Sequence, residues 1–139
     1  MIRRAATADL PAIREIQKAS PDAAQWDPVG YEAYVADVDG RVIGFLVSRA
    51  VAAEEVEILN LAVAPEYRRR GVARELLGAL LKSVRGDVFL EVREANQGAR
   101  KFYQAIGFKE VARRRSYYED PPDHGIVMNF YSCYGGGGR

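Results

Sequence analysis

The amino-acid sequence predicts a mixed α/β fold, in which one sheet of about six or seven mostly antiparallel strands carries helices on both faces. Three observations lead to this prediction. Near the middle of the chain, an apolar strand runs through a glycine-containing turn into a helix with apolar residues at four-residue spacing. The pair Asp39-Gly40 separates two strand-like runs, which is typical of a hairpin. Two further strand-like runs end the chain and are expected to pair with each other.

Each element is placed by the residues that start or stop it. Thr7 or Asp9 is expected to cap the first helix, which has Pro11 in its first turn. Asn96 is expected to cap the last helix, and Gly107 stands where a C-cap glycine belongs. In chain order, the expected elements are a strand over 2–6, a helix ending near 20, an irregular connection over 21–30, strands over 31–38, 41–49 and 55–63, a helix over 69–84, a strand over 88–93, a helix over 96–106, and strands over 108–118 and 124–131, linked by residues 119–123.

The turn before the central helix is the most informative part of the chain. It holds consecutive arginines and Gly71, and it leads directly into the helix. The first N–H groups of a helix lack partners within the helix, and the macrodipole adds partial positive charge there. A phosphate-bearing ligand suits such a place. Val72 follows Gly71 where a Walker loop needs Lys, and the three spaced glycines of a dinucleotide fingerprint are missing.

Composition narrows the classes of function. A chain of 139 residues is expected to form one domain, over residues 1–134, with a disordered glycine-rich tail at 135–139. A formal net charge of +1 gives no overall attraction to nucleic acid, and no apolar run reaches the length of a membrane span. Cys133 is the only cysteine and His124 the only histidine, which excludes an intrachain disulfide and a multi-histidine metal site. We expect a cytoplasmic location, since a signal peptide is also missing.

Residues 57–108 resemble the GNAT superfamily of acyl-CoA-dependent N-acyltransferases. The matching motifs are the strand Leu-Ala-Val-x-Pro at 61–65, the turn Arg-x-x-Gly-x-Ala at 68–73, Leu-Glu-Val-Arg at 90–93, and Asn96 followed by Tyr103-x-x-x-Gly107-Phe108. The resemblance implies the GNAT fold, in which the parallel strands that hold Val63 and Glu91 splay apart. It also implies an enzyme that moves an acetyl group directly from acetyl-CoA to a primary amine, with no metal.

The resemblance further implies how acetyl-CoA is held. Backbone groups of the splayed strand would pair with the pantetheine arm as if it were an added strand, and the turn would bind the pyrophosphate. Gly71 is expected to be needed because a Cβ would hinder close approach of the backbone. The implied cofactor-binding residues are Leu61, Ala62, Val63, Arg68, Arg69, Arg70, Gly71, Val72, Ala73, Arg74 and Asn96.

By the same resemblance, Tyr103 is the general acid that protonates the departing thiolate, and a glutamate takes the amine proton. Glu91 matches the base of the bacterial RimI-type branch, whereas Glu57 matches the base of the histone-acetyltransferase branch. Regular alternation along the strand would put Glu57 and Asn60 on opposite faces. We prefer Glu91 as the base because the end of the chain also resembles the RimI-type branch.

That ending is Arg-Arg-Ser-Tyr-Tyr at 114–118 followed by Ile-Val-Met at 126–128, as in protein N-terminal acetyltransferases. Tyr117 and Trp26 are therefore expected to bind the acceptor, the α-amine of a protein or peptide. His124-Gly125 departs from the Asp-Ala of these relatives. Two alternatives stay open, namely a small-molecule amine acetyltransferase and a non-catalytic acyl-CoA-binding module. The sequence does not predict an oligomeric state.

Overall fold

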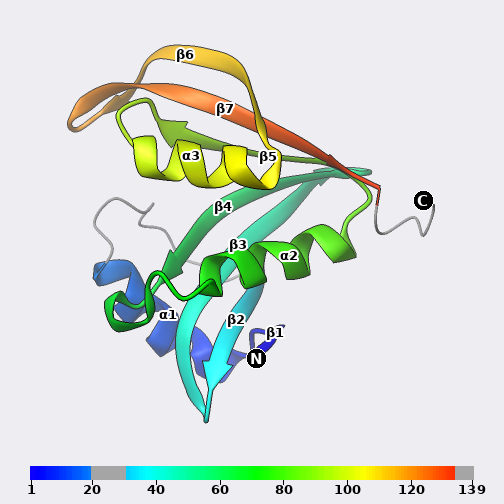
Figure 1. Cartoon of the computed structure of the whole chain (residues 1–139), viewed down its shortest axis with the longest axis vertical. Helices are drawn as coiled ribbons and strands as arrows, with labels where there is room; N and C mark the ends of the chain where they lie inside the picture. Colours follow the sequence, from blue (N-terminus) through cyan, green and yellow to red (C-terminus); the bar gives the residue numbers. More distant parts are fainter. Residues whose placement is uncertain (20–30, 134–139) are drawn as a thin grey trace.

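The computed structural model describes residues 1–19 and 31–133, so that Trp26 and the predicted tail lie outside the described residues. These residues form one seven-stranded sheet with helices on both faces (Figure 1). The elements are β1 (Ile2–Arg4), the 3-10 turn η1 (Thr7–Asp9), α1 (Leu10–Lys18), β2 (Glu32–Val38), β3 (Arg41–Ala52), β4 (Glu55–Val63), the 3-10 turn η2 (Pro65–Tyr67), α2 (Val72–Ser83), β5 (Gly86–Arg93), α3 (Gln97–Ile106), β6 (Lys109–Glu119) and β7 (Pro122–Ser132).

The strands are ordered β1-β2-β3-β4-β5-β7-β6, and every neighbouring pair is antiparallel except β4 and β5. These two parallel strands pair only at residues 55–57 and 87–89. Beyond that point they diverge, so that β4 runs toward α1 while β5 runs beside β7 (Figure 1). The predicted mixed sheet with a splayed parallel pair is confirmed.

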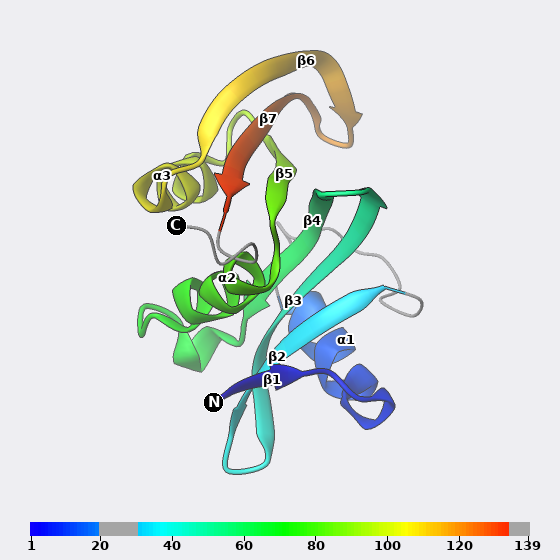
Figure 2. The same ribbon diagram turned by 90° about the vertical axis from the view of Figure 1, so that its right-hand side faces the viewer.

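Two clusters of buried apolar side chains lie on the two faces of the sheet. In Figure 2, α1 covers one face while α2 and α3 cover the other. The larger cluster lies under α2 and α3 and includes Leu46, Ile58, Leu76, Leu80, Val88, Leu90, Tyr103, Phe108 and Met128. The smaller cluster lies against α1 and includes Ile13, Ile16, Val35, Phe45, Val47 and Ala62. No helix in the described ranges is long and apolar enough to cross a membrane.

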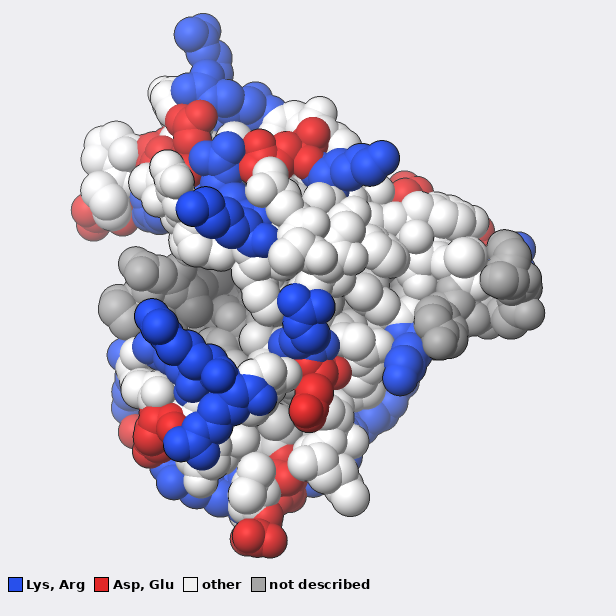
Figure 3. Space-filling view, viewed as in Figure 1, with Lys and Arg blue, Asp and Glu red and all other residues white. Residues whose placement is uncertain are grey.

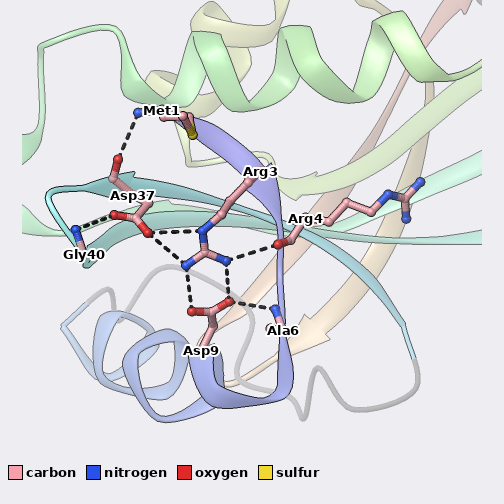
Figure 4. A network of polar contacts seen from close by, with 7 residues as sticks. All are labelled: Met1, Arg3, Arg4, Ala6, Asp9, Asp37 and Gly40. Atoms are coloured by element: carbon pink, nitrogen blue, oxygen red, sulfur yellow. Dashed lines mark hydrogen bonds and ion pairs between the residues drawn. The ribbon is translucent and has the colours of Figure 1, made fainter.

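A charged network fastens β1 to the N-terminal half of the sheet (Figure 4). Arg3 donates to both carboxylate oxygens of Asp9, at 2.8 and 3.0 Å, and to Asp37 on β2 at 3.0 and 3.1 Å. Asp9 occupies the predicted cap position of α1, but its side chain accepts the Ala6 N–H at 2.7 Å instead of a helical N–H. The hydrogen bonds from Arg3 lower the pKa of this buried carboxyl group below its usual range.

The element order matches the prediction, while several boundaries differ. Strand β3 continues to Ala52, and α2 begins only at Val72, because Arg69 and Gly71 have left-handed φ angles of 66° and 81°. The last hairpin is tighter than predicted, since only residues 120–121 separate β6 from β7.

A bulge in β4 overturns the predicted alternation. The pairing of β4 with β3 shifts between Asn60 and Ile58, so Leu59 is an extra residue on β4. An extra residue reverses the side to which the following residues point. Glu57 and Asn60 therefore project from the same face of the sheet, the face against which α1 packs, and not from opposite faces.

Candidate active site

The turn between η2 and α2 presents backbone N–H groups to a cavity. The first helical hydrogen bond runs from the Glu75 N–H to the Gly71 carbonyl, and no side chain caps the helix start. The cavity, of about 390 Å³, is lined by Val63, Tyr67, Arg68, Arg69, Gly71, Val72, Ala73, Arg74 and Phe102. Figure 3 shows Lys and Arg side chains gathered over the start of α2, at the rim of a hollow below α3. Most of the predicted cofactor residues thus border one space.

Glycine is required at position 71 by the backbone conformation and not by crowding from neighbouring atoms. Its φ of 81° lies in the left-handed region, which glycine adopts without cost. A Cβ at this position would meet no protein atom within 4 Å. The predicted obstruction therefore does not come from the described residues of the protein; Gly71 itself lines the cavity.

The arginines of the turn have different partners. Arg68 donates from Nε to the Val63 carbonyl at 3.0 Å, which ties the turn to the end of β4. The guanidinium of Arg70 lies over the Tyr67 ring at 5.3 Å, and that of Arg41 lies 5.5 Å from the same ring. Arg68 and Arg70 therefore shape the turn, while Arg68, Arg69 and Arg74 line the cavity.

The C-terminal part of β4, residues 58–63, has an open edge. Residues 58–63 pair with β3 on one side, but within the described residues the pairing with β5 stops at Glu57. Leu61, Ala62 and Val63 lie along this stretch, as predicted. An extended ligand with amide groups can pair with such an edge as an additional strand.

Asn96 and Tyr103 lie on α3. The Asn96 Oδ1 accepts the Ala99 N–H at 3.1 Å, which confirms Asn96 as the cap of this helix. Tyr103 is buried and packs edge-on against Phe102 and Phe108, with ring centroids 5.1 and 5.3 Å apart. Burial raises the pKa of Tyr103, so its phenol keeps its proton at neutral pH.

Glu91 holds a carboxylate with one unpaired oxygen. Its Oε1 accepts from Arg114 at 3.4 Å, whereas its Oε2 is buried and has no hydrogen-bond partner in the described part of the chain. Burial raises the pKa of Glu91; Arg114 opposes this effect and the nearby charge of Glu57 adds to it. A buried carboxyl group with a raised pKa, unlike a fully paired one, is typical of a general base.

Glu57 lies near Glu91 but in a different environment. Its carboxylate pairs with Arg49 of β3 at 2.9 Å. Both glutamates project from the face of the sheet on which α1 lies, whereas Leu90, the neighbour of Glu91, faces α2 and α3. Tyr103 belongs to the cluster that contains Leu90, so the predicted acid and base lie on opposite faces of the splayed pair.

The C-terminal hairpin places two tyrosines beside Glu91. Tyr117 is 45% exposed, and its ring stands edge-on to that of Tyr118 at 5.0 Å. The guanidinium of Arg114 lies 4.2 Å from the Tyr117 ring, and that of Arg93 lies 4.3 Å from the Tyr118 ring. Burial and then the charge of Glu91 raise the pKa of Tyr118, so Tyr118 also faces this carboxylate.

Sequence reasoning missed Arg114 and Arg93 as partners of the two tyrosines. The Arg-Arg-Ser-Tyr-Tyr run contained the signal for Arg114, but the position of the tyrosines beside Glu91 is set by the local strand geometry. Pairing of β6 with β7 is interrupted between Arg114 and Tyr118, where Ser116 has a φ of 52°. The Ser116 N–H donates to Nδ1 of His124 at 2.9 Å. His124 thus holds the bulge that presents the two tyrosines.

Fold and site together define an acetyltransferase. The pattern of the acetyltransferase (GNAT) family matches residues 2–108, so the chain belongs to this family. Within the described part of the chain, no group of three or more His, Cys, Asp or Glu side chains is arranged to hold a metal ion. The predicted family and the predicted class of enzyme are confirmed.

Two relatives are similar over much of the chain. The ribosomal protein bS18-alanine N-acetyltransferase of Salmonella typhimurium is 34% identical over 136 residues, which cover 88% of this chain and 90% of that protein. An N-alpha-acetyltransferase of Sulfurisphaera tokodaii is 35% identical over 111 residues, which cover 67% of this chain and 66% of that protein. The crystal structure of the ribosomal-protein-S18-alanine N-acetyltransferase from Escherichia coli superposes with a TM-score of 0.81 and 29% identity, covering 96% of this chain and 94% of that one.

Proposed function

We propose that this protein transfers an acetyl group from acetyl-CoA to the α-amine of a protein or peptide that begins with a small residue. The observation that carries the proposal is the partly buried carboxylate of Glu91, one oxygen of which has no hydrogen-bond partner among the described residues, at the splay of β4 and β5 beside the tyrosines of the C-terminal hairpin. Glu57, the competing base, is already paired with Arg49.

The residues at the splay fit acetyl-CoA. The uncapped start of α2 offers N–H groups and partial positive charge to the pyrophosphate, and Arg69 and Arg74 add full charges at the cavity. The open edge of β4 offers backbone groups to the amides of the pantetheine arm. This arrangement would lead the thioester into the gap between Glu91 and Tyr103, from the side of α2.

The reaction then needs two proton transfers. The amine nitrogen attacks the thioester carbonyl, its proton passes to Glu91, and the new C–N bond forms as the C–S bond breaks. The phenol of Tyr103 donates its proton to the departing thiolate, which leaves as the thiol. An α-amine has a pKa near 8, so a useful fraction is neutral at physiological pH, and one glutamate suffices as the base.

The hairpin supports a peptide acceptor. Tyr117 and Tyr118 can hold a peptide backbone through their hydroxyl groups, while their edge-on rings leave room beside them for a small first side chain. The two relatives described above are enzymes that act on a protein α-amine by their names. The cytoplasmic location stays a prediction.

A comparison of three acceptors tests the proposal. Rates with acetyl-CoA should be measured on a peptide that starts with Ala, on its N-terminally blocked twin with an internal Lys, and on spermidine. We expect the free Ala peptide to react fastest. A clear preference for the blocked peptide or for spermidine contradicts the α-amine assignment. If no thiol is released from acetyl-CoA with any of the three acceptors, the proposed function is wrong.

A further inference from the structure

Gly125 of β7 lies directly beside the carboxylate of Glu91. In the sheet it pairs with Arg93, two residues along β5 from Glu91 and on the same face. A Cβ built on Gly125 would overlap Oε2 of Glu91, the oxygen without a hydrogen-bond partner. The same Cβ would lie 3.1 Å from Cδ of Glu91 and 3.2 Å from Cδ2 of Tyr117.

Space, and not backbone conformation, is what this glycine provides. Its φ is not in the left-handed region, in contrast to Gly40, Gly71, Gly86 and Gly107. Any residue could adopt this backbone, but only glycine leaves the volume that the Glu91 carboxylate occupies. The ring of Tyr117 borders this volume.

We propose that Gly125 is a positioning residue for the general base: the space left by its missing side chain holds the Glu91 carboxylate in its partly buried place beside Tyr117. The proposal rests on the proposed function only where it calls Glu91 the base. The placement of the carboxylate can be tested whether or not the protein transfers acetyl groups.

A methyl group at Gly125 has a defined consequence. The atom that it meets is the end of a flexible side chain, so Glu91 can rotate away while the sheet keeps its form. Outside the niche the carboxylate regains water, and the burial that raises its pKa is lost. The titratable and charged groups around Glu91 are Arg114, Tyr117 and Tyr118 on β6, Arg93 on β5 and Glu57 on β4, and none of them is substituted in the variant.

The experiment compares Gly125→Ala with Gly78→Ala. Gly78 lies in α2, where a Cβ would meet nothing within 4 Å, so this variant controls for the added methyl group. Carboxyl carbon NMR follows the titration of Glu91, whose signal is identified by its absence in Glu91→Gln. In Gly125→Ala we expect the Glu91 midpoint to fall toward the ordinary value of about 4.3, and turnover to fall by roughly tenfold or more. In Gly78→Ala both should equal those of the unchanged protein.

A second pair of variants separates positioning from simple loss of packing. In the Glu91→Asp background the shorter side chain leaves room for a methyl group, so adding Gly125→Ala should change the rate little. This double variant also keeps the test open if the single variant fails to fold. The proposal is overturned if Gly125→Ala leaves the Glu91 titration unchanged, or if it lowers the rate equally in both backgrounds. If the unchanged protein acetylates no amine but its Glu91 titration still depends on Gly125, the proposed function is wrong. The placement of the Glu91 carboxylate by Gly125 is then still supported.

Discussion

Asp9 and Glu91, one beside each half of the sheet, differ in how completely their carboxylates are hydrogen-bonded. In the N-terminal half, Asp9 receives hydrogen bonds on both oxygens from Arg3 and one more from the Ala6 N–H. In the C-terminal half, Glu91 has one distant arginine partner and one oxygen with none. The pKa of Asp9 is accordingly lowered by Arg3, while the pKa of Glu91 is raised by burial.

The difference indicates that one carboxylate stabilises the fold while the other is suited to accept a proton. A fully paired carboxylate stabilises the half that carries α1 and the first four strands, because leaving the paired state costs hydrogen bonds to a charge. A half-paired carboxylate costs stability and is retained where a proton must be taken. Only the short ladder between residues 55–57 and 87–89 joins β4 to β5, so Glu91, the proposed base, lies where the two halves separate.

The largest effect is expected from Tyr103→Phe, which removes the acid and keeps the ring. Turnover at saturating substrates should fall by roughly a hundredfold or more, because the thiolate then leaves without a proton donor. The stability should hold, since the contacts with Phe102 and Phe108 remain. Steady-state kinetics and thermal unfolding check both parts. If turnover is unchanged, Tyr103 is only a packing residue.

A smaller effect, of roughly tenfold to a hundredfold at neutral pH, is expected from Glu91→Gln. A base works only above its pKa, so the raised pKa of Glu91 should appear as the acidic limb of the profile of kcat/KM against pH, and the variant should lose that limb. Glu57→Gln is the matched control and should keep it, since Glu57 is paired with Arg49. The reverse result would transfer the role of base to Glu57.

Next in size is the effect of Gly71→Leu on the affinity for acetyl-CoA, which should fall by about tenfold or more as the side chain enters the ligand space. Gly40→Leu is a matched control in the β2–β3 turn, where φ is 85° and a Cβ also meets nothing within 4 Å. Both variants should lose about 1–2 kcal/mol of stability through the left-handed backbone. Calorimetry should show weaker binding for Gly71→Leu alone; equal affinities would exclude the turn as the pyrophosphate site.

The smallest effect concerns stability and compares the two carboxylates directly. Asp9→Asn should lower the free energy of unfolding by about 1 kcal/mol at neutral pH. Because the pKa of Asp9 is lowered by folding, its contribution is present above the unfolded value of about 3.9 and is lost as pH falls. The pKa of Glu91 is raised, so its ionised form costs stability as pH rises, and Glu91→Gln should be at least as stable at neutral pH. Urea unfolding near neutrality and in acid tests both signs, and a stability loss in both variants would erase the contrast.

Features that depend on neighbouring residues could be predicted from the amino-acid sequence. Asp39-Gly40 forms the predicted turn, Asn96 caps α3, and Gly71 precedes the helix whose start faces the cavity. Turn and cap chemistry acts within a few residues, and apolar periodicity sets which side of an element is buried. The order of strands and helices, and the family, followed from these local signals.

The way in which distant residues come together at the site depends on the three-dimensional fold and could not be predicted. The bulge at Leu59 turns Glu57 to the face of Asn60, Arg68 binds the end of β4, and the empty side of Gly125 holds the carboxylate of Glu91. Each of these depends on the register between strands that are far apart in the sequence. A shift of one residue would send every side chain to the other face, and no local pattern specifies the register across the sheet.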